Sequence, residues 1–96
     1  LNHLRAQCLI ASAYAVAGYA EAAMRHAERC LALSAEAGDH QTAFDRATAH
    51  GCAANAYARA GRMNEAREHH RLAREAAQAF DDPDETEVFE RLYPAP

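Results

Sequence analysis

The chain repeats itself at an offset of 43 residues, and this repeat limits its fold more than any other feature. The segment from Ala13 reads AYAVAGYAEAAMRHAERC, and the segment from Ala56 reads AYARAGRMNEAREHHRLA. Alanines coincide easily in so alanine-rich a chain, but the same register also aligns rarer residues. The aligned pairs are Tyr14 with Tyr57, Gly18 with Gly61, Ala23 with Ala66, His26 with His69, and Asp39 with Asp82. We therefore interpret the chain as two copies of one structural unit.

Each unit is predicted to be a helix, a tight turn and a second helix. Apolar residues of the first unit recur three and four positions apart, which is the spacing of one helix face. They are Ile10, Tyr14 and Ala17 before the glycine, and Ala20, Ala23, Met24, Ala27 and Leu31 after it. Gly18 and Gly61 stand where the first helix of each unit must end, because glycine accepts the left-handed backbone that such turns commonly need. The two helices of a unit must then run antiparallel.

The predicted architecture is all-α, with two antiparallel helical hairpins and a short C-terminal capping helix. We expect helices near 3–17, 20–37, 40–60 and 63–80, with Gly38 ending the second and Asp39 capping the third. Asp84 and Glu87 have the capping-box spacing for the last helix. A single helical-repeat domain, 1–96, would then hold repeat one (about 3–38), repeat two (about 39–80) and the capping helix (about 85–93). The side chains expected to be buried are Ile10, Tyr14, Ala23, Ala27, Leu31, Tyr57, Ala66 and Phe80.

Composition argues against two classes of partner. All ten basic residues are arginine and the formal net charge is only -4, so no strong field steers the protein toward nucleic acid. No apolar stretch approaches the roughly 18 residues that a membrane-spanning helix needs. We therefore predict neither a nucleic-acid partner nor a membrane partner.

Three cysteines, Cys8, Cys30 and Cys52, make an odd number, and each lies within a helical pattern. We expect unpaired thiols and a reducing, cytoplasmic setting. Because the first residue is Leu1 and not Met, we also expect the chain to be the C-terminal part of a longer protein.

The repeated unit resembles the tetratricopeptide repeat, whose helix pair carries a Tyr in the first helix, a Gly at the turn and an Ala early in the second helix. The matching residues are Tyr14, Gly18 and Ala23 in the first unit, and Tyr57, Gly61, Glu65 and Ala66 in the second. The period is longer than the standard one of about 34 residues. It is similar to the extended repeats of some bacterial regulators, signalling proteins and motor light chains. The resemblance implies a fragment of a tetratricopeptide-like α-α superhelix that binds a protein or peptide and is not an enzyme.

The resemblance also implies that partners bind on the concave face made by the first helix of each pair. In this chain that face would carry Arg5, Cys8, Ser12 and Val16 from the first unit, and Thr48, Gly51, Asn55 and Arg59 from the second. An asparagine at the place of Asn55 often binds the backbone or terminal carboxylate of a partner peptide, since its amide both donates and accepts. The lysines of carboxylate-binding members are missing, and Arg5 or Arg59 would stand in for them. The alternative is a ligand-sensing or peptide-sensing regulatory domain of a larger bacterial regulator, which an enclosed polar pocket would favour.

Other candidate sites have simpler explanations. His26 and Cys30 have the i, i+4 spacing of two metal ligands, but two ligands do not make a site, so no metal or cofactor is predicted. His50 and Cys52 diverge on one helix, which argues against nucleophilic catalysis. A basic stripe on the last long helix would carry Arg67, His70, Arg71 and Arg74. We interpret it as a solvated face, with Arg71 paired to Glu68 and Glu75, His69 exposed and His70 on the outer flank.

Docking on a further domain or dimerisation is also expected, because about three stacked repeats are usually needed for stability. The first hairpin would supply the contact, since the C-terminal end carries its own capping helix.

Overall fold

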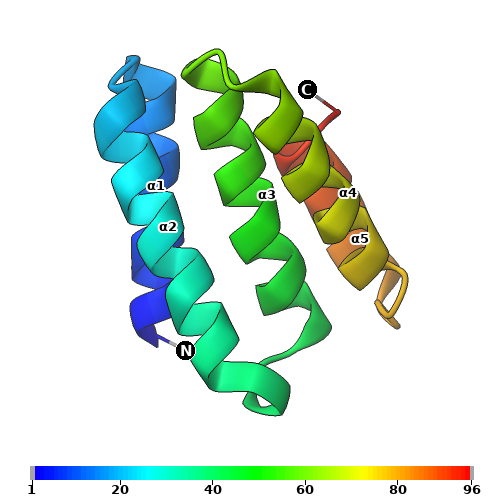
Figure 1. Cartoon of the computed structure of the whole chain (residues 1–96). Coiled ribbons are helices and arrows are strands. Elements are labelled where there is room, and N and C mark those ends of the chain that lie inside the picture. The colour runs from blue at the N-terminus through cyan, green and yellow to red at the C-terminus, as the bar shows by residue number, and fades with distance from the viewer. Residues whose placement is uncertain (1, 96) are drawn as a thin grey trace.

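The computed structural model describes residues 2–95, and all regular structure in this range is helical (Figure 1). The elements are α1 (Asn2–Ala17), α2 (Ala20–Ala37), the short 3-10 helix η1 (Gly38–His40), α3 (Ala43–Arg59), α4 (Met63–Ala77) and α5 (Pro83–Leu92). The predicted all-α class is confirmed. The predicted helix ends lie within three residues of the observed ones.

The two hairpin turns share one backbone geometry. Gly18 has a φ of 88° and Gly61 a φ of 78°, a conformation that strains any residue with a Cβ. In both turns the residue after the glycine donates its backbone N–H to the carbonyl of the unit's tyrosine, at 2.8 Å in the first unit and 2.9 Å in the second. The sequence repeat is therefore also a repeat of backbone structure.

The α3 helix is the centre of the molecule. It packs against α4 in its own hairpin, against α1 and α2 of the first hairpin, and against α5, which returns along the second hairpin (Figure 1). Most side chains at these crossings are alanines, such as Ala27, Ala53 and Ala66, which are fully buried. Small contact residues allow the helix axes to approach closely.

Two predicted helix caps are wrong. The third helix begins after Thr42 rather than after Asp39, because Gly38–His40 forms the 3-10 turn and the Thr42 hydroxyl accepts the Asp45 N–H at 3.0 Å. The last helix is capped by Asp82, whose carboxylate accepts the Asp84 N–H at 2.9 Å, with Pro83 in the first turn. Proline at that position leaves no amide to satisfy, so the helix begins before the expected capping box.

The predicted core is correct for four side chains and wrong for two. Ala23, Ala27, Tyr57 and Ala66 are buried as expected; Leu31 and Phe80 are half-buried against the core. Ile10 and Tyr14, predicted to be buried, are each 38% exposed. Tyr14 stacks on His26 of α2, but neither Ile10 nor Tyr14 belongs to a buried cluster of the described residues.

Candidate functional site

A pocket of about 620 Å³ lies between α1, α3 and the end of α5. It is partly open, and most of its wall is apolar. The six residues predicted to bind a partner all line it: Arg5, Cys8 and Ser12 from α1, and Thr48, Asn55 and Arg59 from α3. They converge because each set recurs at helical spacing on one side of its helix. We refer to this pocket as the groove.

Large apolar side chains at the edge of the groove are exposed. Leu9 is 74% exposed and Val16, which was also expected on this face, is 79% exposed. Leu92 on the opposite edge is 52% exposed. Single exposed apolar side chains are common, but three around one hollow form a patch on which apolar groups can be buried.

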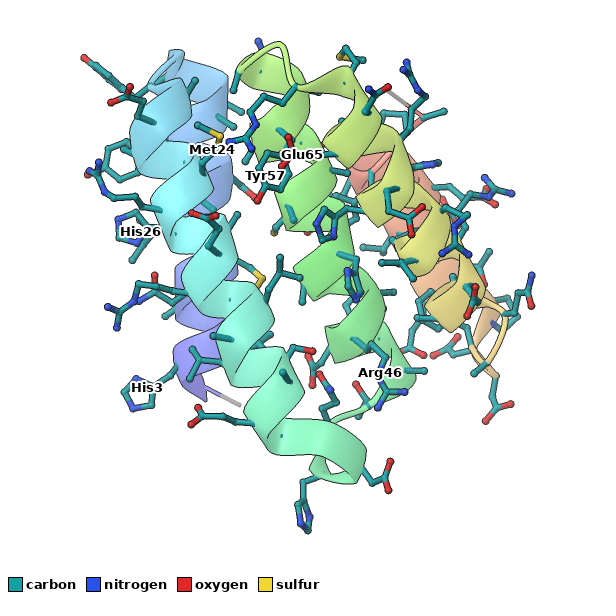
Figure 2. The ribbon with its side chains drawn as sticks, viewed as in Figure 1. His3, Met24, His26, Arg46, Tyr57 and Glu65 are labelled. Atoms are coloured by element: carbon teal, nitrogen blue, oxygen red, sulfur yellow. A yellow bond between two sulfur atoms is a disulfide. The ribbon has the colours of Figure 1, made fainter. Side chains whose placement is uncertain are left out.

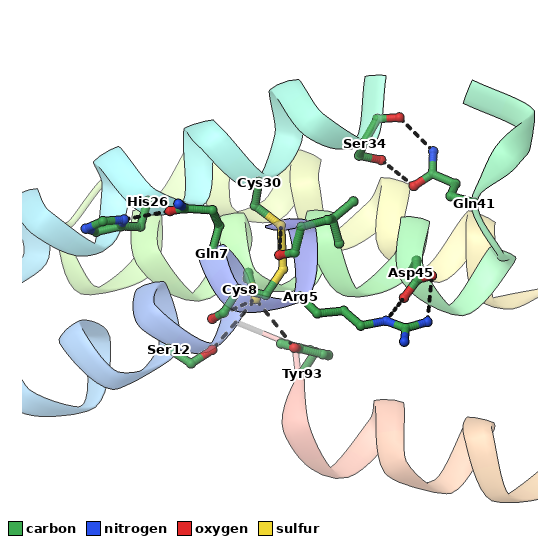
Figure 3. Close-up of a disulfide and its surroundings, with 12 residues drawn as sticks. Arg5, Gln7, Cys8, Ser12, His26, Cys30, Ser34, Gln41, Asp45 and Tyr93 are labelled. Carbon is green, nitrogen blue, oxygen red and sulfur yellow. Dashed lines mark hydrogen bonds and ion pairs between the residues drawn. A yellow bond between two sulfur atoms is a disulfide. The ribbon is translucent and has the colours of Figure 1, made fainter. Parts of the chain in front are cut away.

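Arg5 is held by a residue that the sequence analysis did not identify. Its guanidinium donates twice to the Asp45 carboxylate, with Nε and a terminal nitrogen each 3.1 Å from an oxygen (Figure 3). Asp45 is only 2% exposed, so its carboxylate depends on this cation. Arg5 therefore joins α1 to α3 and does not serve as the free carboxylate-binding group that we expected.

Cys8 is covalently bonded to another cysteine, so the prediction of three free thiols is wrong. Cys8 and Cys30 form a disulfide between α1 and α2 (Figure 3). Cys52 is the free thiol. The antiparallel packing of the hairpin places the two Cα atoms 6.0 Å apart, a separation that a disulfide can span. The expectation of a reducing compartment rested on free thiols, so it loses that support.

Cys52 is buried next to the groove, among polar groups of α1 and of Tyr93. Its Sγ is 3.6 Å from the Cys8 carbonyl oxygen, 3.7 Å from the Ser12 hydroxyl and 3.5 Å from the Tyr93 hydroxyl. Burial raises the pKa of the Cys52 thiol, and a protonated, buried thiol is a poor nucleophile.

The end of α5 and the residues after it, 91–94, form part of the groove wall. The Asn55 amide donates to the Leu92 carbonyl, with Nδ2 and O 3.4 Å apart. The Tyr93 carbonyl lies 3.2 Å from Nε2 of His70, and burial raises the pKa of the Tyr93 phenol. His70 is therefore a buried residue, and its predicted place on the outer flank is wrong.

Because Gly51 has no side chain, the Tyr93 ring can pack directly against α3. A Cβ built on Gly51 would lie 2.5 Å from the Cγ of the Tyr93 ring, so a larger residue in the middle of α3 would displace the aromatic side chain. The repeat register predicts Gly51 on the groove face but does not predict its neighbour Tyr93. A glycine inside a helix is a signal of such a close approach.

The remaining predicted residues keep polar groups at the groove. The Thr48 hydroxyl is buried and has no hydrogen-bond partner among the described residues. Within residues 2–95, Arg59 forms no ion pair, and the Asn55 side-chain oxygen accepts no hydrogen bond from the protein. The Arg59 guanidinium and the Asn55 side-chain oxygen can therefore bond an incoming ligand without breaking an existing interaction, whereas the Thr48 hydroxyl is not accessible to one.

The outer face of α4 was predicted to be a solvated face of paired charges, and the structure agrees in part. Arg71 pairs with Glu68 at 2.8 Å and with Glu75 at 3.0 Å, and all three side chains are more than half exposed. His69 is not exposed as predicted: it is half-buried, stacked on Tyr57 and adjacent to His50.

Within the described residues, no three His, Cys, Asp or Glu side chains form a metal-binding group. Among the same residues, no helix is both long and apolar enough to cross a lipid bilayer. Comparison of the chain with protein-family models, with characterised proteins and with solved structures found no match.

Proposed function

We propose that the chain is a non-catalytic protein-interaction module of tetratricopeptide type that binds a peptide segment in the groove between α1, α3 and the C-terminal segment. One observation carries the proposal. Asn55, the residue expected to hold a partner backbone, donates its amide to the Leu92 carbonyl, which is itself a peptide carbonyl. Its side-chain oxygen and second N–H could bond a further peptide group, since a side-chain amide both donates and accepts.

The walls of the groove indicate the class of peptide. Leu9, Val16 and Leu92 offer apolar surface, so large apolar side chains of a ligand would be buried there. Arg59 at one end offers a guanidinium, which binds a carboxylate through two parallel hydrogen bonds. A peptide with apolar residues followed by an acidic side chain or a terminal carboxylate meets both requirements.

The shape of the pocket favours this function over the sensing of a small molecule. A pocket that encloses most of a small molecule would support a ligand-sensing regulatory domain. The groove is instead open along part of its length, as a site for an extended peptide must be. We therefore favour an interaction module over a sensor of small molecules.

Selection from a displayed library of random peptides tests the proposal without a known partner. Peptides enriched on the wild-type chain would be synthesised and titrated against the wild type, Asn55→Ala and Val16→Glu. We expect Asn55→Ala to weaken binding by about 1 to 2 kcal/mol, the usual effect of losing such hydrogen bonds. Val16→Glu should weaken it more, because it places a charge on the apolar edge.

Arg71→Ala is the matched control, since Arg71 lies on the outer face of α4. The circular dichroism of every variant must equal that of the wild type. Equal losses from Asn55→Ala and Arg71→Ala would contradict binding in the groove, and so would the absence of any enriched peptide.

A further inference from the structure

Equivalent faces of the two units differ in what covers them. On α3, the face formed by Ala49, Ala53, Ala56 and Tyr57 is buried against the first hairpin, and Tyr57 is only 6% exposed. The residues 43 positions earlier are Ala6, Ile10, Ala13 and Tyr14, and all four are exposed. We call this surface of α1, together with the adjoining His26 of α2, the Tyr14 face.

The Tyr14 face already has the conformation of its buried counterpart. The Tyr14 and His26 rings are stacked with centroids 5.5 Å apart and planes within 12°, and Tyr57 and His69 have the same separation with planes within 13°. The N–H at Nδ1 of His26 donates to Gln7 Oε1 at 2.7 Å, which fixes the ring. The aromatic surface is therefore formed before anything covers it.

The second unit shows how a helix binds to such a surface. Tyr57 donates its hydroxyl hydrogen to the Glu28 carboxylate of α2 at 3.3 Å. Met24, four residues earlier, is 3.9 Å from the Arg62 guanidinium that covers the Tyr57 ring, and Figure 2 shows Met24 and Tyr57 meeting between α2 and α3. Leu31, three residues after Glu28, packs against both apolar clusters.

We propose that the Tyr14 face is a docking site for an amphipathic helix of a partner protein. The helix carries an acidic residue that accepts the Tyr14 hydroxyl hydrogen, with apolar residues four positions before it and three after it. Tyr19, which is 64% exposed and stands edge-on to Tyr14, occupies the place of Arg62. An aromatic ring there receives a methionine or leucine of the partner. His26 lies on the outer side of the first hairpin, away from α3, so a helix can approach it (Figure 2).

A second copy of this chain does not meet these requirements. The Glu28 side of its α2 is already covered by its own α3. In the repeat register its α4 carries Arg67, Arg71 and Arg74 in place of Met24, Glu28 and Leu31. Arginine side chains at these three positions cannot bury the apolar surface of the Tyr14 face. They also cannot accept the hydroxyl hydrogen of Tyr14.

The test uses the chain's own covering helix as the probe. A fluorescent peptide of residues 20–37 with C30S is titrated into the full chain and followed by anisotropy. A second peptide also carries Met24→Arg, Glu28→Arg and Leu31→Arg, which copies the contact residues of α4. We expect the first peptide to bind and the second to bind at least about tenfold more weakly.

Variants of the full chain locate the binding surface. Ile10→Glu should abolish binding, and Tyr14→Phe, which keeps the ring, should weaken it by about five- to tenfold through loss of one charge-assisted hydrogen bond. Val88→Glu is the matched control, because Val88 has a similar exposure of 42% and lies outside both surfaces.

Three outcomes would overturn the proposal: no binding of the first peptide at millimolar concentration, equal binding of both peptides, or binding insensitive to Ile10→Glu. A fourth is concentration-dependent self-association of the chain that Ile10→Glu removes, which would make the face an interface between two copies. None of these outcomes depends on whether the groove binds a peptide.

Discussion

The ring of Tyr57 stacks on the ring of His69, with centroids 5.5 Å apart and planes within 13° of parallel. His69 also approaches His50, and the two Nδ1 atoms are 3.1 Å apart. At that distance one ring donates its N–H and the other accepts, so the pair is stable only while at least one ring is neutral. Burial lowers the pKa of both histidines; the positive charge of His69 and Arg46 lowers that of His50 further, and Glu68 opposes this effect.

The histidine pair should make stability depend on pH. Because the unfolded chain binds these protons more tightly, the stabilisation is complete above the ordinary histidine pKa of about 6.5 and is lost as pH falls through the lowered values. The first unit has Gln7 at the place of His50, so His50→Gln should keep the contact to His69 and remove one titrating group. We expect its melting temperature to fall by a few degrees less than that of the wild type between pH 7.5 and pH 5. Thermal unfolding followed by circular dichroism measures the difference.

Substitution of the exposed His40 by glutamine controls for the loss of a histidine in general. It should reproduce the wild-type pH dependence. An identical fall in all three proteins would show that the pair does not titrate within the folded state.

The pair between Arg5 and Asp45 should contribute more to stability than the surface ion pairs do. Arg5→Ala leaves a nearly buried carboxylate without its cation, so we expect a larger loss of stability than from an exposed pair, although the Arg5 side chain is itself 58% exposed. Arg91→Ala breaks an exposed pair with Glu87 and should cost less than about 0.5 kcal/mol. Urea unfolding of the two variants tests the ranking. Equal losses would mean that solvent screens the Asp45 carboxylate.

The disulfide between Cys8 and Cys30 predicts a specific thiol count. Protein denatured without reductant should show one reactive thiol, from Cys52, and reduction should raise the number to three. The bond closes a loop with a sequence separation of 22, for which chain entropy gives a stabilisation of roughly 3 kcal/mol. Cys30→Ser should lose about that amount and become insensitive to reductant. Three thiols before reduction would contradict the pairing.

The helices could be predicted from the sequence because their signals are local. Positive-φ glycines at Gly18 and Gly61 and apolar residues at helical spacing determine the hairpins without reference to distant parts of the chain. The same repeat register placed Arg5, Ser12, Asn55 and the other predicted binding residues on one groove. Their positions follow from helix geometry and from the packing of equivalent helices.

The remaining contacts depend on which distant elements meet, and local spacing carries no such information. To predict the disulfide, one must know the register in which α1 packs against α2. To predict the ion pair of Arg5, one must know that α1 meets Asp45, which lies 40 residues away in the sequence. The exposure of Tyr14 differs from that of Tyr57 because only the second tyrosine meets a covering helix, although both stand in the same local pattern. The position of Tyr93 depends on where α5 returns, which the break around Pro83 does not specify.

Because Gly51 lies against the Tyr93 ring, we expect Gly51→Ala to destabilise the wild type but to stabilise a Tyr93→Ala variant. In the wild type, Gly51→Ala places a Cβ 2.5 Å from the Tyr93 ring, so the ring must move, and we expect a net loss of about 1 to 2 kcal/mol from overpacking. In a Tyr93→Ala background the obstacle is gone, and the same change should stabilise the chain by up to about 1 kcal/mol, because alanine favours a helix more than glycine does. Urea unfolding of the four proteins closes the double-mutant cycle, and the interaction energy should exceed about 1 kcal/mol. Ala58→Gly, on the same helix, is a control that should destabilise both backgrounds equally. If Gly51→Ala were instead stabilising by the same amount with and without Tyr93, the aromatic ring would not lie against Gly51, and that end of the groove would be open to a partner.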